Sequence, residues 1–268
     1  MNLQRKIDTI TKGSIVRVGI GVDYPHENVI FYAIDAEDFA DIVLVGDEEK
    51  ISSTGTDIEI IDTKSPEKEL ISLLVEGEID AAVRGNLRAS ETLNQLKTQT
   101  NLEKIYRMAL LQTTSKDTFF LSPVGIDEGK SAEEKIEIIR LGSELLKRFD
   151  LEAKVGVLSG GRFGDVGRSE VVDRSLEEAE LIVQKVTGMG ICAKHHQILI
   201  EDAVKESNII IAPDGISGNL IFRTLVLLGG GMGFGAPILM DKVFIDTSRA
   251  SDSYGRAIKL ASMLALKL

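Results

Sequence analysis

Short apolar runs alternate with longer amphipathic stretches along most of the chain, and this alternation most constrains the fold. Runs such as Asp41–Gly46 (DIVLVG) and Asn208–Ala212 (NIIIA) are typical of buried strands. Ser131–Arg148 has apolar residues near the helical period, and Ser131 with Glu134 forms a capping-box pattern at its start. Strands that alternate with helices predict an α/β protein with parallel-rich sheets and right-handed crossovers.

The same criteria predict the remaining elements. The expected strands are Ser14–Val22, Ile58–Asp62, Ile79–Val83, Lys154–Leu158 and Lys242–Ile245, with Tyr106–Thr113 and Thr118–Val124 as a pair. The expected helices are Pro66–Glu76, Ser90–Lys97, Arg168–Lys185, Gln197–Lys205, Leu220–Leu228 and Ser251–Leu268. A polar stretch at Gln112–Lys116 (QTTSK) is the candidate break between two domains.

Composition narrows the function classes. The chain has 268 residues and a formal net charge of −11, which disfavours broad nucleic-acid binding because such a surface repels phosphate backbones. Cys192 has no second cysteine with which to pair, and we expect it to be a small core residue in a reducing, cytoplasmic environment. The longest uncharged stretch, Leu225–Met240, contains five glycines and is too short for a membrane-spanning helix.

Two loops after predicted strands have the composition of anion sites. Ligands of open α/β sheets bind beyond the carboxyl ends of the strands. Arg84–Arg88 offers two arginines beside a glycine, and its alternative is a solvated turn. Ser159–Ser169 is glycine-rich, so its backbone N–H groups can approach a ligand, and Arg162 or Arg168 can add positive charge. The alternative for this second loop is a flexible surface segment.

Two further loops place polar side chains at strand ends. Pro213–Asn219 follows a buried strand, and Asp246–Asp252 combines hydroxyls, a guanidinium and carboxylates before the last helix. Either loop can be a binding site or a turn with a helix cap. His195 and His196 are adjacent, so their rings diverge and we expect no metal site there.

The last two loops together resemble the C-terminal signature of the phosphate acyltransferases, the phosphotransacetylase and phosphotransbutyrylase family. That family has an apolar strand, PD-x-x-x-GN, a helix, a G-P loop and D-x-SR. Upstream, VGVLSGGRFGDVG is similar to the family's serine-containing loop at Leu158, Ser159 and Gly164. The compact, divergent pattern resembles an archaeal branch called methanogenesis marker protein 4, also labelled the methyltransferase-related MtxX family. The positions that match the C-terminal signature are Pro213, Asp214, Gly218, Asn219, Pro237, Asp246, Ser248 and Arg249.

This resemblance implies a two-domain fold of the isocitrate/isopropylmalate dehydrogenase-like type with an interdomain cleft. Residues 1–112 with 241–268 would form the first α/β domain, and residues 113–240 the second. The family's architecture implies a homodimer through the second domain.

The resemblance also implies roles for individual residues. Ser248 would stabilise an oxyanion, Arg249 would hold phosphate, and Asp252 would act as the base, since the family's own aspartate position is Gly255 here. One of the family's arginines is replaced by Asn94. Arg84, Arg88 or Arg162 would have to supply the missing charge, and Ser159, Gly160, Asp214 and Asn219 complete the expected substrate-binding set.

Three functions follow as hypotheses. The first is a phosphate acetyl/butyryltransferase-like enzyme that acts on a small anionic substrate, phosphorylated or CoA-linked, with CoA a substrate rather than a tightly bound cofactor. The second is a methyltransferase-related protein of methanogenesis. The third is a non-catalytic ligand-binding protein on the same scaffold.

Overall fold

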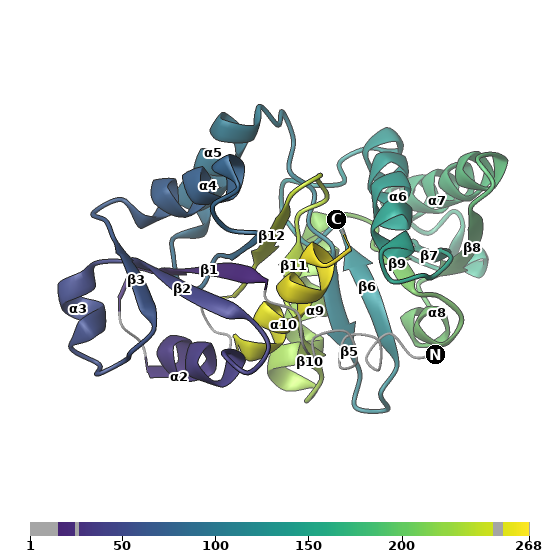
Figure 1. Ribbon diagram of the computed structural model, residues 1–268. Coiled ribbons are helices and arrows are strands. Elements are labelled where there is room, and N and C mark those ends of the chain that lie inside the picture. Colours follow the sequence, from purple (N-terminus) through teal and green to yellow (C-terminus); the bar gives the residue numbers. More distant parts are fainter. Residues whose placement is uncertain (1–15, 25–26, 249–253, 268) are drawn as a thin grey trace. The chain divides into compact units, whose positions relative to one another are not determined.

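The computed structural model describes residues 16–24, 27–248 and 254–267, and it divides into two compact units (Figure 1). The first unit contains the described residues up to Ile105 and those from Phe234 onward, and the second contains Tyr106–Gly233. Each unit has its own six-stranded sheet. The chain is therefore an α/β protein with two mixed, parallel-rich sheets, as the alternation of apolar and amphipathic stretches predicts.

The first sheet has the strand order β11-β12-β4-β1-β2-β3 and is parallel except for β11. Its strands are β1 (Arg17–Val22), β2 (Asp41–Gly46), β3 (Glu59–Asp62), β4 (Ala81–Val83), β11 (Ala236–Pro237) and β12 (Val243–Asp246). Its helices are α2 (Glu27–Ala36), α3 (Glu48–Ser52), α4 (Pro66–Glu76), α5 (Ala89–Thr100) and α10 (Gly255–Ala265).

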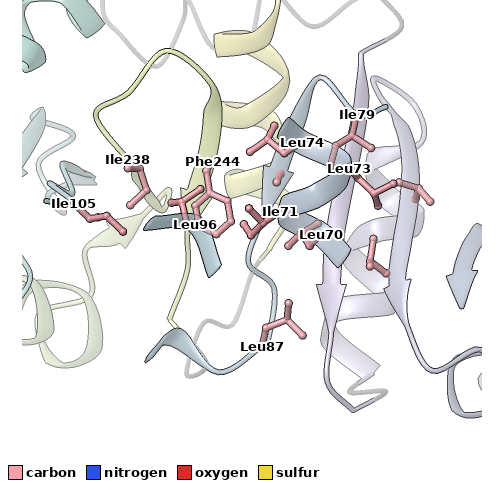
Figure 2. Close-up of a cluster of buried hydrophobic side chains, with 13 residues drawn as sticks. Leu70, Ile71, Leu73, Leu74, Ile79, Leu87, Leu96, Ile105, Ile238 and Phe244 are labelled. Carbon is pink, nitrogen blue, oxygen red and sulfur yellow. The ribbon is translucent and has the colours of Figure 1, made fainter. Parts of the chain in front are cut away.

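Helices cover both faces of this sheet, with α4 and α5 on one side and α2 and α10 on the other (Figure 1). The core under α4 and α5 is formed by buried aliphatic side chains such as Leu70, Leu74 and Ile79, together with Phe244 of β12 (Figure 2). Burial on both faces explains why the strands read as continuous apolar runs.

The second sheet has the order β10-β5-β6-β9-β7-β8, in which β6, β9, β7 and β8 are parallel. Its strands are β5 (Ala109–Gln112), β6 (Thr118–Ser122), β7 (Lys154–Leu158), β8 (Cys192–Gln197), β9 (Ile209–Ile211) and β10 (Met232–Gly233). Its helical segments are α6 (Ala132–Lys147), η1 (Phe163–Asp165), α7 (Glu170–Gly188), α8 (Ile200–Glu206), α9 (Gly215–Arg223) and the π-helical turn η2 (Thr224–Leu228).

The predicted start of one helix is too early, and the edge strand β8, the two-residue strands β10 and β11, and the helices α2 and α3 are not predicted from the sequence. The predicted helix Gln197–Lys205 begins at Ile200, because Gln197 is the last residue of strand β8. Strand β8 (CAKHHQ) lies at the edge of the sheet and is largely polar, so it lacks the apolar run by which the other strands are recognised. Cys192 begins this strand and is exposed, which corrects its expected place in the core.

The chain passes from one unit to the other at two points. The polar stretch Gln112–Lys116 is the turn of the antiparallel β5–β6 hairpin, so both of its strands belong to the second sheet. Where the chain returns to the first unit, β11 pairs with β12 of the first sheet. The described units therefore change at Ile105/Tyr106 and Gly233/Phe234, where the sequence predicted residues 112/113 and 240/241. None of the described helices is long and apolar enough to cross a membrane.

His196 of β8 is a buried imidazole on the face of the sheet that α8 covers. Among the described residues its Nε2 has no hydrogen-bond partner, and a carboxylate oxygen of Glu206 is 3.9 Å away. Burial lowers the pKa of His196 below its ordinary value of 6.5, and the Lys194 charge adds to this effect. The folded chain therefore holds His196 neutral.

We expect the free energy of unfolding to fall as the pH drops below about 6.5, because the unfolded chain then binds a proton that folded His196 resists. Above that pH, His196 is neutral in both the folded and the unfolded chain, so the free energy of unfolding is not reduced. The variant His196→Leu should lose this part of the pH dependence in urea unfolding at pH 7.5 and pH 5.0. An unchanged difference between the two pH values in the variant would contradict this account.

Candidate functional site

A cavity of about 650 Å³ lies at the carboxyl ends of the parallel strands of the second sheet. Its wall includes Ser159 and Gly160 after β7, Asp214 after β9, and Lys135 of α6. This is the edge at which ligands bind in open α/β sheets. Three of the predicted site residues, Ser159, Gly160 and Asp214, therefore line one cavity.

Asp214 caps helix α9 at the wall of this cavity. One of its carboxylate oxygens accepts hydrogen bonds from the Ser217 backbone N–H at 2.7 Å and from the Ser217 hydroxyl at 2.6 Å. Burial by itself would raise the pKa of Asp214, but the hydrogen bonds from Ser217 outweigh it and hold the pKa below its ordinary value. The carboxylate is consequently ionised, and it occupies the N–H groups of the first turn of α9.

The glycines of the PDGISGN loop allow α9 to start in close contact with the loop after β6. A Cβ at Gly215 would lie 1.7 Å from the Gly125 carbonyl oxygen, and one at Gly218 would lie 1.9 Å from that of Pro123. The Asn219 side-chain amide donates to the Val124 carbonyl at 2.9 Å. Asn219 thus holds two loops of the site together, and it is not among the cavity-lining residues.

We expect Gly218→Ala to destabilise the fold by about 3 kcal/mol or more, because backbone on both sides must move to admit the methyl group. Gly164→Ala is the matched control, since a Cβ there meets nothing within 4 Å. It should change stability by no more than about 0.5 kcal/mol. Chemical denaturation measures both, and equal effects would contradict the close approach described above.

Ser159 is hydrogen-bonded to a histidine that is in turn hydrogen-bonded to a glutamate. Ser159 Oγ lies 2.9 Å from His195 Nε2, and His195 Nδ1 lies 2.6 Å from Glu180 Oε1. Ser159 and the His195 side chain are almost fully buried, whereas the Glu180 side chain is 56% exposed. The three side chains come from the end of β7, from β8 and from α7.

The backbone beside this group has an unusual conformation. Gln197 has φ +58°, a left-handed value that non-glycine residues seldom adopt. Its carbonyl accepts from Ser159 N–H at 2.8 Å, and its side-chain oxygen accepts from Phe163 N–H at 2.9 Å. Such strained residues persist where the surroundings fix them, and they cluster at functional sites. Gln197 here fixes the start of the glycine-rich loop.

The charges around the cavity are mixed. Lys135 is 3% exposed, and its Nζ lies 2.8 Å from a carboxylate oxygen of Glu178 on α7. Lys130 and Arg174 also line the cavity, and both are exposed. Within the described part of the chain their side chains have no ion-pair partner closer than 4 Å. The cavity therefore combines one neutralised buried cation with two cations that remain available to a ligand.

Arg84 and Asp246, two of the predicted residues of the first unit, lie in a cluster at the carboxyl ends of β1, β4 and β12. The buried guanidinium of Arg84 is paired with Asp246 and donates to the Leu87 carbonyl. Thr247 Oγ1 donates to the Gly85 carbonyl at 2.8 Å, and Asn86 binds the backbone of the loop after β1. These contacts connect the loops that follow three neighbouring strands.

Arg88, Arg162 and Ser248 occupy three different environments. Arg88 is half exposed and pairs with Glu67 and Glu91. Arg162 precedes η1 and is exposed. Ser248 follows β12 and is partly exposed. Arg249 and Asp252, the other two predicted catalytic residues, lie outside the residues that the structure describes.

We expect Arg84→Met to lower the free energy of unfolding by about 3–5 kcal/mol, because it removes the arginine that is paired with the buried Asp246 carboxylate. Arg140→Met is the matched control, since Arg140 makes exposed pairs with Glu137 and Glu144 that contribute about 1 kcal/mol or less. Urea unfolding at neutral pH compares the two variants. A loss for Arg140→Met as large as that for Arg84→Met would contradict the buried role of the Arg84 pair.

Sequence reasoning missed three residues of the second unit. Lys135 could have been found, because it shares one helix face with Ile138, Ile139 and Gly142, where a lysine is out of place. His195 was considered only as a metal ligand, and the described residues contain no group of three or more metal-ligating side chains. Glu180 has no distinguishing signal on α7, which has acidic residues along its length.

Comparison with known proteins identifies the relatives of this chain. No family model matches it. A protein of Methanosarcina acetivorans named "Putative methyltransferase mtx subunit X" is 50% identical over 266 residues, which cover 98% of this chain and 95% of that protein. The chain belongs to the MtxX family. A Methanocaldococcus jannaschii protein named as an uncharacterized methyltransferase is 44% identical over 86% of this chain and 96% of its own length.

The structural neighbours of this MtxX protein include phosphotransacylases. A branched-chain phosphotransacylase from Enterococcus faecalis has a TM-score of 0.74 at 15% identity, covering 93% of this chain and 99% of that one. EutD phosphotransacetylase from Staphylococcus aureus has a TM-score of 0.70 at 18% identity, with coverages of 99% and 98%. At such identities the likeness establishes the fold alone. The resemblance noted in the sequence is therefore confirmed as a phosphate acyltransferase-like fold in the MtxX branch.

Proposed function

We propose that this MtxX protein is a transferase that binds a small anionic substrate, phosphorylated or CoA-linked, in the cavity of its second unit. The observation that carries this proposal is the position of the cavity at the carboxyl ends of β7 and β9, with Lys130 and Arg174 on its wall. A volume of about 650 Å³ suits a small phosphorylated molecule or the acyl end of a CoA thioester. In a chain of net charge −11, two cations on one cavity that have no ion pair among the described residues favour an anionic ligand.

The resemblance to phosphate acyltransferases suggests that the group transferred is an acyl group. In that reading Ser248, Arg249 and Asp252 keep the catalytic roles that the resemblance implies. Arg162 or Arg88 adds the positive charge that is missing because Asn94 replaces one of the family's arginines. The buried pairing of Arg84 with Asp246 makes Arg84 the least available of the candidate arginines. CoA is a substrate in this proposal and not a resident cofactor.

A thermal-shift titration tests the proposal with acetyl phosphate, inorganic phosphate and CoA as probes. At 100 times its dissociation constant a ligand stabilises the fold by about 2.7 kcal/mol, which corresponds to about 5–10 °C. We expect such a shift with a phosphate-bearing probe. The double variant Lys130→Ala/Arg174→Ala should weaken binding by at least about tenfold, since it removes charge-assisted contacts.

Lys147→Ala is the control, because Lys147 is an exposed lysine at the other end of α6. It should bind each probe as the wild type does. The proposed substrate class would be wrong if no phosphate-bearing probe shifted the transition. It would also be wrong if the double variant and the control responded alike.

The names of the relatives favour a second candidate, a methyl transfer. Two relatives at 50% identity carry the name of a methyltransferase subunit. S-adenosylmethionine therefore belongs in the same titration. A shift with this methyl donor alone, and none with acetyl phosphate or CoA, would favour methyl transfer over acyl transfer. A non-catalytic binding protein would bind a probe without turning it over.

The finer fold class is also a proposal. A 4-hydroxythreonine-4-phosphate dehydrogenase from Salmonella typhimurium has a TM-score of 0.65 over 93% of this chain and 99% of its own. This likeness supports the isocitrate/isopropylmalate dehydrogenase-like class that the sequence suggests.

We further propose that the chain forms a homodimer through the apolar surface of α9 and η2. Ile216, Leu220 and Leu227 follow a helical spacing, and they are 60%, 60% and 41% exposed. Leu228 is 84% exposed beside them. A stripe of this kind is self-complementary across a two-fold axis and is costly to leave in water.

Leu220→Asp with Leu228→Asp should convert the dimer to a monomer in light scattering coupled to size exclusion. Each exposed residue contributes little to the monomer fold, so the thermal transition should shift only through the loss of dimerisation. Val166→Asp is a control, since Val166 is an exposed apolar residue near η1. A wild-type chain that is monomeric at micromolar concentration would contradict the proposal.

A further inference from the structure

The hydrogen-bonded series Ser159–His195–Glu180 has the connectivity of an activated nucleophile. Ser159 Oγ is 2.9 Å from His195 Nε2, and His195 Nδ1 is 2.6 Å from Glu180 Oε1. When His195 is neutral and its Nδ1–H donates to the carboxylate, Nε2 is left as the acceptor for the serine hydroxyl. Serine nucleophiles are recognised by this arrangement of nucleophile, base and orienting carboxylate, whatever their order in the chain.

His195 and Ser159 are each held in place by a further contact. The Phe163 ring and the His195 imidazole meet in an edge-to-face arrangement, with 5.3 Å between their centres. Gln197 accepts a hydrogen bond from the Ser159 backbone N–H, which fixes the serine at the end of β7. The Gly161 carbonyl is a competing acceptor for the Ser159 hydroxyl, but at 3.1 Å it is farther away than His195 Nε2.

The hydrogen-bonded series also leads from the cavity to the solvent-exposed surface. Ser159 lines the 650 Å³ cavity, whereas Glu180 is exposed and lines a separate surface hollow with Phe163. A proton that leaves Ser159 therefore reaches an imidazole whose far nitrogen is bound to a solvent-exposed carboxylate.

The cavity wall beside Ser159 suits an acyl group. Val172, Ile198 and Ile221 are apolar. Lys135 Nζ is paired with Glu178, but an ammonium group has three N–H donors, so it can also donate to an oxygen that becomes negative during attack. An activated acyl donor combines these two requirements, since it carries an apolar chain and a carbonyl that becomes an oxyanion under attack.

We propose that Ser159 is a catalytic nucleophile that accepts an acyl group from an activated acyl donor. Its Oγ forms a bond to the carbonyl carbon, and the hydroxyl proton passes to His195 Nε2. The bond from carbon to the leaving group breaks, and the leaving group departs with the electron pair and takes the proton from His195. Water or a thiol then attacks the acyl-serine and gives its proton to His195, which returns it to Ser159 Oγ.

Glu180 is a positioning residue in this scheme, since within the series it is hydrogen-bonded to His195 and not to Ser159. Acyl transfer by way of Ser159 rests on the proposed function for its substrate class. It does not require Lys130 or Arg174, because a neutral ester can donate the acyl group. The two proposals can therefore fail separately.

The experiment uses the full chain with Cys192→Ser, because Cys192 is an exposed thiol that would react on its own. p-Nitrophenyl acetate and acetyl phosphate serve as acyl donors. We expect a burst of p-nitrophenolate and one acetyl group per chain, which peptide mass spectrometry locates on Ser159. The Lys130→Ala/Arg174→Ala variant should give the same burst with p-nitrophenyl acetate.

Variants then separate the roles. Ser159→Ala should abolish the burst, and Ser159→Cys should restore acylation with a nucleophile of similar size. His195→Gln should slow acylation by at least about 100-fold. His196→Leu is the matched control, because His196 lies on the opposite face of the same strand, and it should leave the burst unchanged. Thermal unfolding of each variant verifies that it is folded.

Glu180→Gln tests the positioning role by spectroscopy. The chain has three histidines, so the ¹⁵N resonances of His195 can be assigned by substitution. We expect the tautomer protonated at Nδ1 in the unsubstituted protein and a mixture of tautomers in Glu180→Gln. The proposal is overturned if neither donor acetylates the chain, if Ser159→Ala retains the acetylation, or if His195→Gln reacts as fast as the parent.

Discussion

The pairing of β9 with β6 and β7 decides where the functional residues of the second unit lie. Ile211 of β9 pairs with Ser122 of β6 on one side and with Val157 of β7 on the other, so the three strands end together. The chain then leaves the sheet at Pro123, Ser159 and Pro213, all at one edge. The cavity, the capped start of α9 and the serine beside the histidine all depend on this alignment.

Much of this alignment could be predicted from the sequence. Apolar runs such as NIIIA are unambiguous because a parallel strand is buried on both faces. The Asp-x-x-Ser spacing at Asp214 and Ser217 indicates a helix cap, and the structure contains it. Glycines at 215 and 218 were recognised only as part of a motif. Their physical reason, close contact with the backbone at Pro123 and Gly125, requires the three-dimensional structure.

The position of His195 beside Ser159 could not be predicted, because it depends on a polar edge strand. β8 is polar, so nothing in its composition separates it from a loop or a helix start. Without that strand there is no register to bring His195 beside Ser159, which lies 36 positions earlier in the chain. The same strand turns His195 and His196 to opposite faces, one toward α7 and the other toward α8. The sequence could show that their rings diverge but not what each ring meets.

In the first unit the candidate residues are easy to find in the sequence, but their role becomes clear only in the structure. Arg84, Asp246 and Ser248 are found easily because they follow apolar strands. The structure shows that Arg84 and Asp246 are engaged with each other in a buried pair. An arginine after a strand can therefore hold neighbouring loops together as well as bind an anion, and only its partner distinguishes the two.

A crystal structure of the protein soaked with acetyl phosphate tests the central claim most directly. Our account predicts ligand density in the cavity of the second unit, against Ser159 and within reach of Lys130 or Arg174. Density beside Ser248 of the first unit, with none in the cavity of the second unit, would contradict it.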